Sequence, residues 1–205
     1  THIFVAFEVR LSAADAGGTW DVYFMNTSGG DSQRVTHDSS RGQDGGGESD
    51  ISPNGSEIVY QCRPRNAKSN QLRIVPTLGG ASRMISEGGR VPKWRPDGMR
   101  IGYLDNREYP KIAFWTIRPD GSDKRFEFSD STWSFDFSWA PDGKSVAWIH
   151  NDGIVIHDLE SGKVQALISK MTGIGELCWV QNDAVVFSCR KAGMFDLWMV
   201  PARGG

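Results

Sequence analysis

Short, mostly apolar segments recur along the whole chain, and each is bounded by glycine, proline or aspartate. The segments are rich in β-branched and aromatic residues, which favour strands over helices. No stretch of useful length shows the 3.6-residue period of an amphipathic helix. The pattern therefore predicts an all-β protein made of many short strands joined by tight turns.

Two turn signatures repeat with a common period. The first has proline followed by Asp-Gly or Asn-Gly, and successive copies lie 43, 45 and 40 residues apart, counted from Pro53 to Pro96, Pro141 and the degenerate Gln181. The second is a glycine turn whose copies lie 50, 41, 41 and 43 residues apart, at positions 29–30, 79–80, 120–121, 161–162 and 204–205. A period of about 40 to 45 residues made of strands and turns is typical of β-propeller blades.

Large aromatic side chains stand at fixed places in each repeat. Tryptophan precedes three of the four proline-type turns, and another aromatic residue lies in the strand after each turn. The two columns are Trp94, Trp139 and Trp179, and then Tyr60, Tyr103, Trp148 and Phe187. One four-stranded antiparallel meander cannot bury both of its faces, so we expect the sheets to stack radially with these columns between neighbours.

The expected fold is an all-β β-propeller of four-stranded antiparallel blades, present as an arc of about five blades. Three blades should be complete, while the first lacks its innermost strand and the fifth its outermost. The expected blades are residues 1–36, 47–86, 90–128, 134–168 and 175–205. Because a closed ring usually needs more blades, we expect a longer parent protein or, as the alternative, two arcs that complete each other.

The repeat resembles a known family. Its pattern W-x-P-D-G-x-x-(I/V)-x-aromatic, followed by a strand, G-G and R-x-(T/S), is similar to the repeats of TolB-type and WD-repeat-like propellers. Residues 34–36 and 83–86 carry the last element, and the pattern departs at Ile51, Asn54 and 181–183. The end of the chain, 200–205, also resembles propeller repeats of prolyl oligopeptidase and tricorn-like peptidases. The resemblance implies a fold that serves many functions.

Composition excludes some partners. With 23 Lys and Arg against 25 Asp and Glu, the net charge of −2 offers no general attraction to nucleic acid. No apolar stretch approaches the length of about 20 residues that a membrane-spanning helix needs. Cys62, Cys178 and Cys189 form no C-x-x-C pair, and two of them fall at equivalent places in separate blades, so we expect three free thiols, buried or half-buried.

Candidate binding residues gather at one end of the blades. Short turns join strands at one end, and long irregular loops, which usually carry recognition, join them at the other. Five residues before three of the four turns stand Glu48, Asp136 and Glu176, and Asp105 and His150 should lie at the same level of the channel mouth. These side chains could bind a cation or a basic peptide segment. The alternative is that each acid caps a local turn or pairs with a nearby Lys or Arg.

No catalytic motif stands out. The chain has no G-x-S-x-G, no H-E-x-x-H and no P-loop. His2, His37 and His157 show no metal-ligand spacing, and residues 120–123 indicate a plain turn rather than a calcium loop. We therefore expect no catalytic residues and no cofactor within the chain, apart from a cation at the channel mouth.

The resemblance and the loop face together suggest a function. We expect a non-enzymatic scaffold, similar to TolB-type propellers, that holds a protein or peptide at the loop face and channel mouth. Nucleic-acid binding and membrane insertion are not expected, self-association could complete the ring, and the family resemblance implies a periplasmic or secreted protein. The alternatives are an accessory propeller that gates a serine peptidase, with its catalytic domain outside this chain, and a propeller polysaccharide lyase with a channel metal.

Overall fold

The computed structural model describes residues 4–10, 19–26, 31, 33–36, 40–41, 48–64, 67–108, 110–132, 134, 136–181, 183–191 and 193–202. Every regular element in these ranges is a β-strand, which confirms the all-β prediction. None of the described segments forms a helix that is long and apolar enough to span a bilayer.

Five antiparallel sheets follow one another along the chain. The first contains β1 (Phe4–Arg10), β2 (Thr19–Asn26), β3 (Gln33–Arg34) and β4 (Ser40–Arg41). The second contains β5 (Ser49–Ile51), β6 (Glu57–Cys62), β7 (Gln71–Pro76) and β8 (Arg83–Glu87). The third contains β9 (Arg90–Trp94), β10 (Ile101–Asp105), β11 (Ile112–Ile117) and β12 (Arg125–Asp130).

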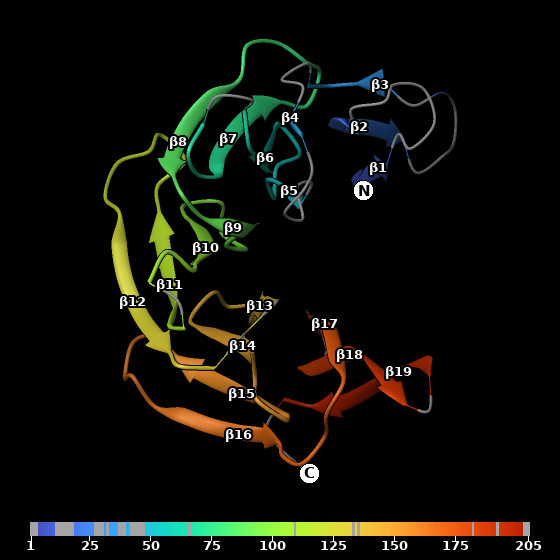
Figure 1. The fold of residues 1–205 in the computed structure, drawn as a ribbon, viewed down its shortest axis with the longest axis vertical. Coiled ribbons are helices and arrows are strands. Elements are labelled where there is room, and N and C mark those ends of the chain that lie inside the picture. Colours follow the sequence, from blue (N-terminus) through green and yellow to red (C-terminus); the bar gives the residue numbers. More distant parts are fainter. Residues whose placement is uncertain are drawn as a thin grey trace.

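The fourth sheet contains β13 (Phe137–Trp139), β14 (Ser145–His150), β15 (Gly153–Asp158) and β16 (Val164–Ile168). The fifth contains β17 (Ile174–Val180), β18 (Ala184–Lys191) and β19 (Met194–Pro201). Strands adjacent in sequence are hydrogen-bonded neighbours in sheets two to five. Figure 1 shows the sheets fanned along an arc, with β5, β9, β13 and β17 on its inner side and β8, β12 and β16 on its outer rim. This arrangement confirms the propeller architecture.

The two end sheets are partial in the way that the repeat predicts. In the first sheet β3 and β4 both pair with β2, so they are two pieces of one outer strand beside β1 and β2. Within the described residues, no inner strand lies beside β1 and no outer strand lies beside β19. Sheets two, three and four each have four strands.

The aromatic columns lie between neighbouring sheets, as expected. Tyr103 and Trp148 are fully buried, and Tyr60 and Phe187 are 3% and 2% exposed. Tyr103 packs with apolar residues of the second and third sheets, and Trp148 packs with those of the third and fourth. Each buried aromatic side chain contributes about 1.5–3 kcal/mol through removal of apolar surface from water, so these columns hold the arc together.

The proline-type turns explain one part of the sequence repeat. Gly55, Gly98 and Gly143 have φ angles of 74°, 71° and 68°, a left-handed conformation that favours glycine. The aspartate before the glycine accepts a backbone hydrogen bond two residues ahead, as from Met99 N to Asp97 Oδ1 at 2.9 Å. The tight turn therefore fixes the angle between the inner strand and the next strand in each blade.

Candidate functional site

A hollow of about 560 Å³ lies among the inner strands. It is lined by the beginnings of the inner strands of sheets two to five and by part of β18 and β19. Three of the five candidate residues predicted from the sequence, Glu48, Asp136 and Glu176, line this hollow. Arg90 and Lys93 line it as well, so the wall carries charges of both signs. The three acids that occupy equivalent positions of the sequence repeat thus lie around the same hollow in the fold.

Glu48 joins the second sheet to the third. Its Oε2 atom accepts a hydrogen bond of 2.7 Å from the backbone N–H of Val91, which lies 43 residues further along the chain. Burial raises the pKa of this carboxyl group, against the opposing effects of the Arg90 charge and the Val91 N–H. Glu48 therefore uses one carboxylate oxygen to satisfy a backbone donor of the next blade instead of capping a turn of its own blade.

Asp136 joins three sheets. Its Oδ1 atom accepts hydrogen bonds from Lys93 Nζ at 2.6 Å and from Phe137 N at 2.9 Å. Its Oδ2 atom accepts one of 3.0 Å from the backbone N–H of Leu177. Lys93 belongs to the third sheet, Asp136 precedes the fourth and Leu177 belongs to the fifth. Both oxygens of the Asp136 carboxylate thus accept hydrogen bonds from the fold itself. The ion pair with Lys93 agrees with the alternative reading of the sequence, in which each acid pairs with a nearby Lys or Arg.

Glu176 differs from these two acids. It is exposed, its backbone N–H donates to Ser188 Oγ at 3.0 Å, and no described residue pairs with its carboxylate. It occupies the same repeat position as Glu48 and Asp136, but in the described chain no further sheet follows the fifth to supply a donor. Of the three acids in the hollow, Glu176 is the exposed one, and its carboxylate accepts no hydrogen bond from another described sheet.

A second column of acceptors was missed in the sequence. Asp50 Oδ2 accepts a hydrogen bond of 2.7 Å from Trp94 N, and Ser138 Oγ accepts one of 2.9 Å from Trp179 N. Burial raises the pKa of Asp50 to about 6, even though the hydrogen bond from Trp94 and the charge of Lys93 act to lower it. The available signal was a polar residue three places before the turn proline, directly before the apolar residue Ile51 or Trp139.

Asp105 does not line the hollow, because it is held by its own loop. Arg107 Nε lies 2.9 Å from both carboxylate oxygens and Arg107 Nη2 lies 2.5 Å from Oδ2. Although burial acts to raise it, these bonds hold the pKa of Asp105 below its ordinary value. The charge of Asp105 is therefore already neutralised within the third sheet.

His150 also lies away from the hollow and pairs locally. Its Nδ1 atom is 2.6 Å from Asp130 Oδ2, and Thr132 Oγ1 donates to the other oxygen of Asp130 at 2.9 Å. Although burial opposes it, this environment lowers the pKa of Asp130. His150 therefore links the loop ends of the third and fourth sheets rather than the channel carboxylates.

The other metal and thiol expectations have mixed outcomes. Among the residues that the structure describes, no three His, Cys, Asp or Glu side chains come together in a group that could hold a metal ion. Cys62 and Cys189 are buried free thiols, but Cys178 is exposed, so the expectation of burial was wrong there. Cys178 lies on the face of β17 that no further sheet covers. His2 and His37 lie outside the described residues.

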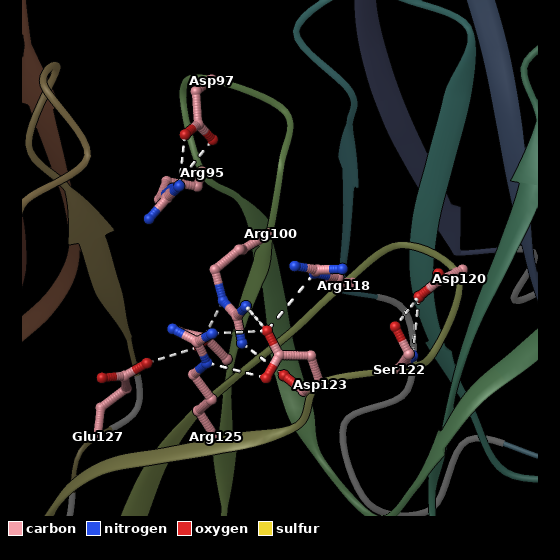
Figure 2. Close-up of polar contacts among 10 residues, drawn as sticks. Arg95, Asp97, Arg100, Arg118, Asp120, Ser122, Asp123, Arg125 and Glu127 are labelled. Atoms are coloured by element: carbon pink, nitrogen blue, oxygen red, sulfur yellow. Dashed lines mark hydrogen bonds and ion pairs between the residues drawn. The ribbon is translucent and has the colours of Figure 1, made fainter.

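A second hollow, of about 380 Å³, lies at the turn end between the third and fourth sheets. Figure 2 shows the ion pairs beside it, where Arg100, Arg118 and Arg125 surround Asp123. Hydrogen bonds from Arg125 and Arg100 lower the pKa of Asp123 to about 2. Arg95 pairs in turn with Asp97 at 2.5 Å. These charges satisfy one another, which indicates a scaffold role for this end.

Comparison with known proteins supports the fold. No protein-family model matches the chain, and no curated protein matches its sequence. TolB from Acinetobacter baumannii superposes with a TM-score of 0.80 at 16% identity, over 98% of this chain and 49% of that protein. A TolB-like protein from Agrobacterium tumefaciens gives 0.75 at 15% identity, over 90% and 71%. The propeller domain of the Trilobed protease from Pyrococcus furiosus gives 0.65 at 14%, over 96% and 78%.

These values bear on architecture only, since all three identities are low. The chain spans about half the length of the Acinetobacter TolB chain. The propeller domain of the Trilobed protease covers 96% of this chain, which lies between the 90% and 98% covered by the two TolB structures. The arc, the order of strands and the stacked sheets show that this chain has the β-propeller fold found in TolB proteins and in peptidase propeller domains.

Proposed function

We propose that the chain is a non-enzymatic binding scaffold that holds a segment of a protein or peptide in the hollow among its inner strands. The observation that carries this proposal is the exposed carboxylate of Glu176 in that hollow. Glu48 and Asp136, its equivalents, are occupied by the neighbouring sheets. The available charge is therefore negative and favours a ligand with a Lys or Arg side chain.

The remaining lining suits a polypeptide. Apolar groups from Pro92, Leu177 and Phe187 lie in the same wall as the charged side chains. Binding sites of this kind combine apolar area with a few polar groups that fix orientation. The fold likeness to TolB proteins is consistent with this role, although the same scaffold serves many others.

A titration with two synthetic peptides tests the proposal. The 205-residue protein is mixed with an alternating alanine–lysine octapeptide and with its alanine–glutamate counterpart, and binding is measured by calorimetry. We expect the lysine peptide to bind more tightly. Glu176→Gln should weaken that binding about two- to fivefold, the size of an exposed ion pair.

Glu160→Gln is the matched control, since Glu160 is an exposed carboxylate that pairs with Lys144 at the other end of the blades. It should leave the affinity unchanged. Equal affinity for both peptides, or an unchanged affinity in Glu176→Gln, would contradict the proposal.

A second candidate is an accessory propeller of a serine peptidase. It is supported by the likeness to the propeller domain of the Trilobed protease, of which the chain covers 78%. The sequence of the complete gene separates the two functions. A hydrolase domain in the same polypeptide would favour the peptidase role, and a gene without one would favour the scaffold role.

A further inference from the structure

A histidine stands in the fourth sheet where the other complete sheets have an aliphatic residue. The register of the third strand against the second places His157 of β15 at the position that Val75 occupies in β7 and Ile117 in β11. Val75 and Ile117 are each 1% exposed and belong to the apolar cores beside their sheets. The fourth sheet therefore carries a titratable ring at a core position of the repeat.

The imidazole of His157 packs between the third and fourth sheets. It stacks on Phe128 of β12, with ring centroids 3.7 Å apart and ring planes 4° apart. It meets Trp148 of β14 edge-on, with centroids 6.2 Å apart, and Trp148 is fully buried. Phe128 and Trp148 also pack against each other at 5.0 Å. The three rings thus form one contact between the two sheets, near the rim of the arc where β12 reaches β15 (Figure 1).

This contact favours a neutral imidazole. Nε2 of His157 is buried and has no hydrogen-bond partner among the described residues, and Nε1 of Trp148 is in the same condition. A neutral imidazole can keep one ring nitrogen unprotonated, whereas the charged form carries a proton on both. Protonation of His157 would therefore put a positive charge, and a buried N–H without an acceptor, into an aromatic contact.

The charged groups near the ring do not offset this cost. Burial lowers the pKa of His157, the charge of His150 on β14 acts in the same direction, and only Asp130 on β12 opposes them among the groups that act on it. Asp130 Oδ2 is already 2.6 Å from His150 Nδ1. Residues 164–168 of β16 are all uncharged. The remaining charged side chains of β12 and β15 have partners of their own: Arg125 with Asp123, Glu127 with Thr116, and Asp158 with Ser161.

β12 therefore presents two different contacts to two histidines of the fourth sheet. Asp130 accepts a hydrogen bond from His150 and tolerates a charge on that ring, whereas Phe128, two residues earlier, stacks on His157 and requires a neutral ring. We propose that the contact between Phe128 and His157 is an acid-sensitive joint, closed at neutral pH and opened when His157 takes up a proton. Because the Asp130–His150 pair persists in weak acid, the opening is local to the strands around His157.

Amide hydrogen exchange of the 205-residue protein at pH 7.5 and pH 5.5 tests the proposal. After correction for the intrinsic exchange rate, the opening equilibrium of β12 and β15 should increase toward the lower pH. The increase can reach about tenfold, the value for an opened imidazole with the ordinary pKa of 6.5 and a closed one that binds no proton. The sign follows from linkage, because the opened state binds the proton more tightly than the closed state does.

Two variants remove the titratable ring and keep an apolar side chain. His157→Phe retains an aromatic ring against Phe128, and His157→Val restores the residue of the second sheet. Both should exchange equally at the two pH values, and either one is sufficient if the other does not fold. His150→Gln is the matched control, since it removes the other histidine of the same interface and should keep the response to acid.

Proton-detected NMR of the imidazole groups gives an independent measurement. The resonance that is missing in His157→Phe should titrate below the ordinary pKa of about 6.5. The proposal is overturned by a His157 resonance that titrates at or above this value, or by equal exchange of wild type at the two pH values. It is also overturned if His157→Phe and His157→Val respond to acid as wild type does, or if His150→Gln abolishes the response.

Discussion

Replacement of Asp136 by alanine tests whether a single carboxylate holds three sheets together. The variant removes the hydrogen bonds from Lys93 Nζ, Phe137 N and Leu177 N. It leaves the buried N–H of Leu177 without an acceptor. It also leaves the Lys93 ammonium, on a side chain that is 28% exposed, with the carbonyl oxygen of Phe137 as a remaining acceptor at 2.6 Å.

The expected loss follows from these contacts. A buried donor left unsatisfied costs about 1–3 kcal/mol, and loss of one partner of a largely buried ion pair costs about 3–5 kcal/mol. Because Lys93 keeps one acceptor and some water, we expect the free energy of unfolding to fall by about 3–5 kcal/mol in total. Asp136→Asn should cost less, since the amide keeps one acceptor oxygen.

The assay is urea unfolding followed by tryptophan fluorescence, with Glu160→Ala as the control. The Lys144–Glu160 pair has side chains that are 57% and 68% exposed, so its loss should change the free energy by no more than about 0.5 kcal/mol. Lys93→Met combined with Asp136→Ala should cost less than the sum of the two single changes, because no stranded ammonium remains. An Asp136→Ala protein as stable as the control, or additive single changes, would refute the reasoning.

Three further changes test other parts of the fold. Burial raises the pKa of Asp50 from 3.8 to about 6, so the folded state is destabilised as this carboxyl group ionises. Wild type should therefore lose stability relative to Asp50→Asn as pH rises from about 4 to 7, by about 3 kcal/mol at most because the residue stays partly accessible. Parallel denaturation curves of the two proteins across this pH range would contradict this expectation. Gly102→Ala places a methyl group 2.8 Å from Trp139 Cζ2 and 2.9 Å from Phe114 Cζ, and should lower stability by about 1–3 kcal/mol in the same assay. Because the pKa of Asp123 is lowered to about 2, its ion pairs stabilise the fold above about pH 4, and this stabilisation is lost as pH falls toward 2. The difference in melting temperature between wild type and Asp123→Asn should therefore be smaller at pH 2 than at pH 6.

Part of the candidate site could be predicted from spacing alone. The 40-odd-residue repeat placed Glu48, Asp136 and Glu176 at equivalent positions, and equivalent positions of radial sheets face a common axis. The same argument placed Asp105 and His150 nearby, but the structure pairs them with Arg107 and Asp130 instead. The pairing of Asp105 with Arg107, two residues further along, is local and agrees with the alternative that an acid pairs with a nearby arginine. The pairing of His150 with Asp130 joins two sheets and depends on how these sheets pack.

The roles of the acids could not be predicted in the same way. Whether Glu48 is free or occupied depends on a backbone N–H that lies 43 residues away and one sheet further along. Cys178 was expected to be buried or half-buried like the other two thiols, yet it is exposed, since no described sheet follows the fifth. The hydrogen bond of Glu48 and the exposure of Cys178 both depend on which sheet packs beside their own, and the sequence of one sheet does not contain that information.

The sequence by itself determined the repeating unit of this protein. Turn chemistry at the Pro-Asp-Gly and glycine positions, together with apolar strands and aromatic columns, is local information, and it fixes four-stranded sheets that must stack to bury both faces. Only the tertiary structure decided which acids serve as links between sheets and which one remains exposed, because a carboxylate is occupied when the adjacent sheet brings a donor within hydrogen-bond distance. The distance between that donor and the carboxylate is set by the packing of whole sheets, so it cannot be predicted from any single segment of the sequence.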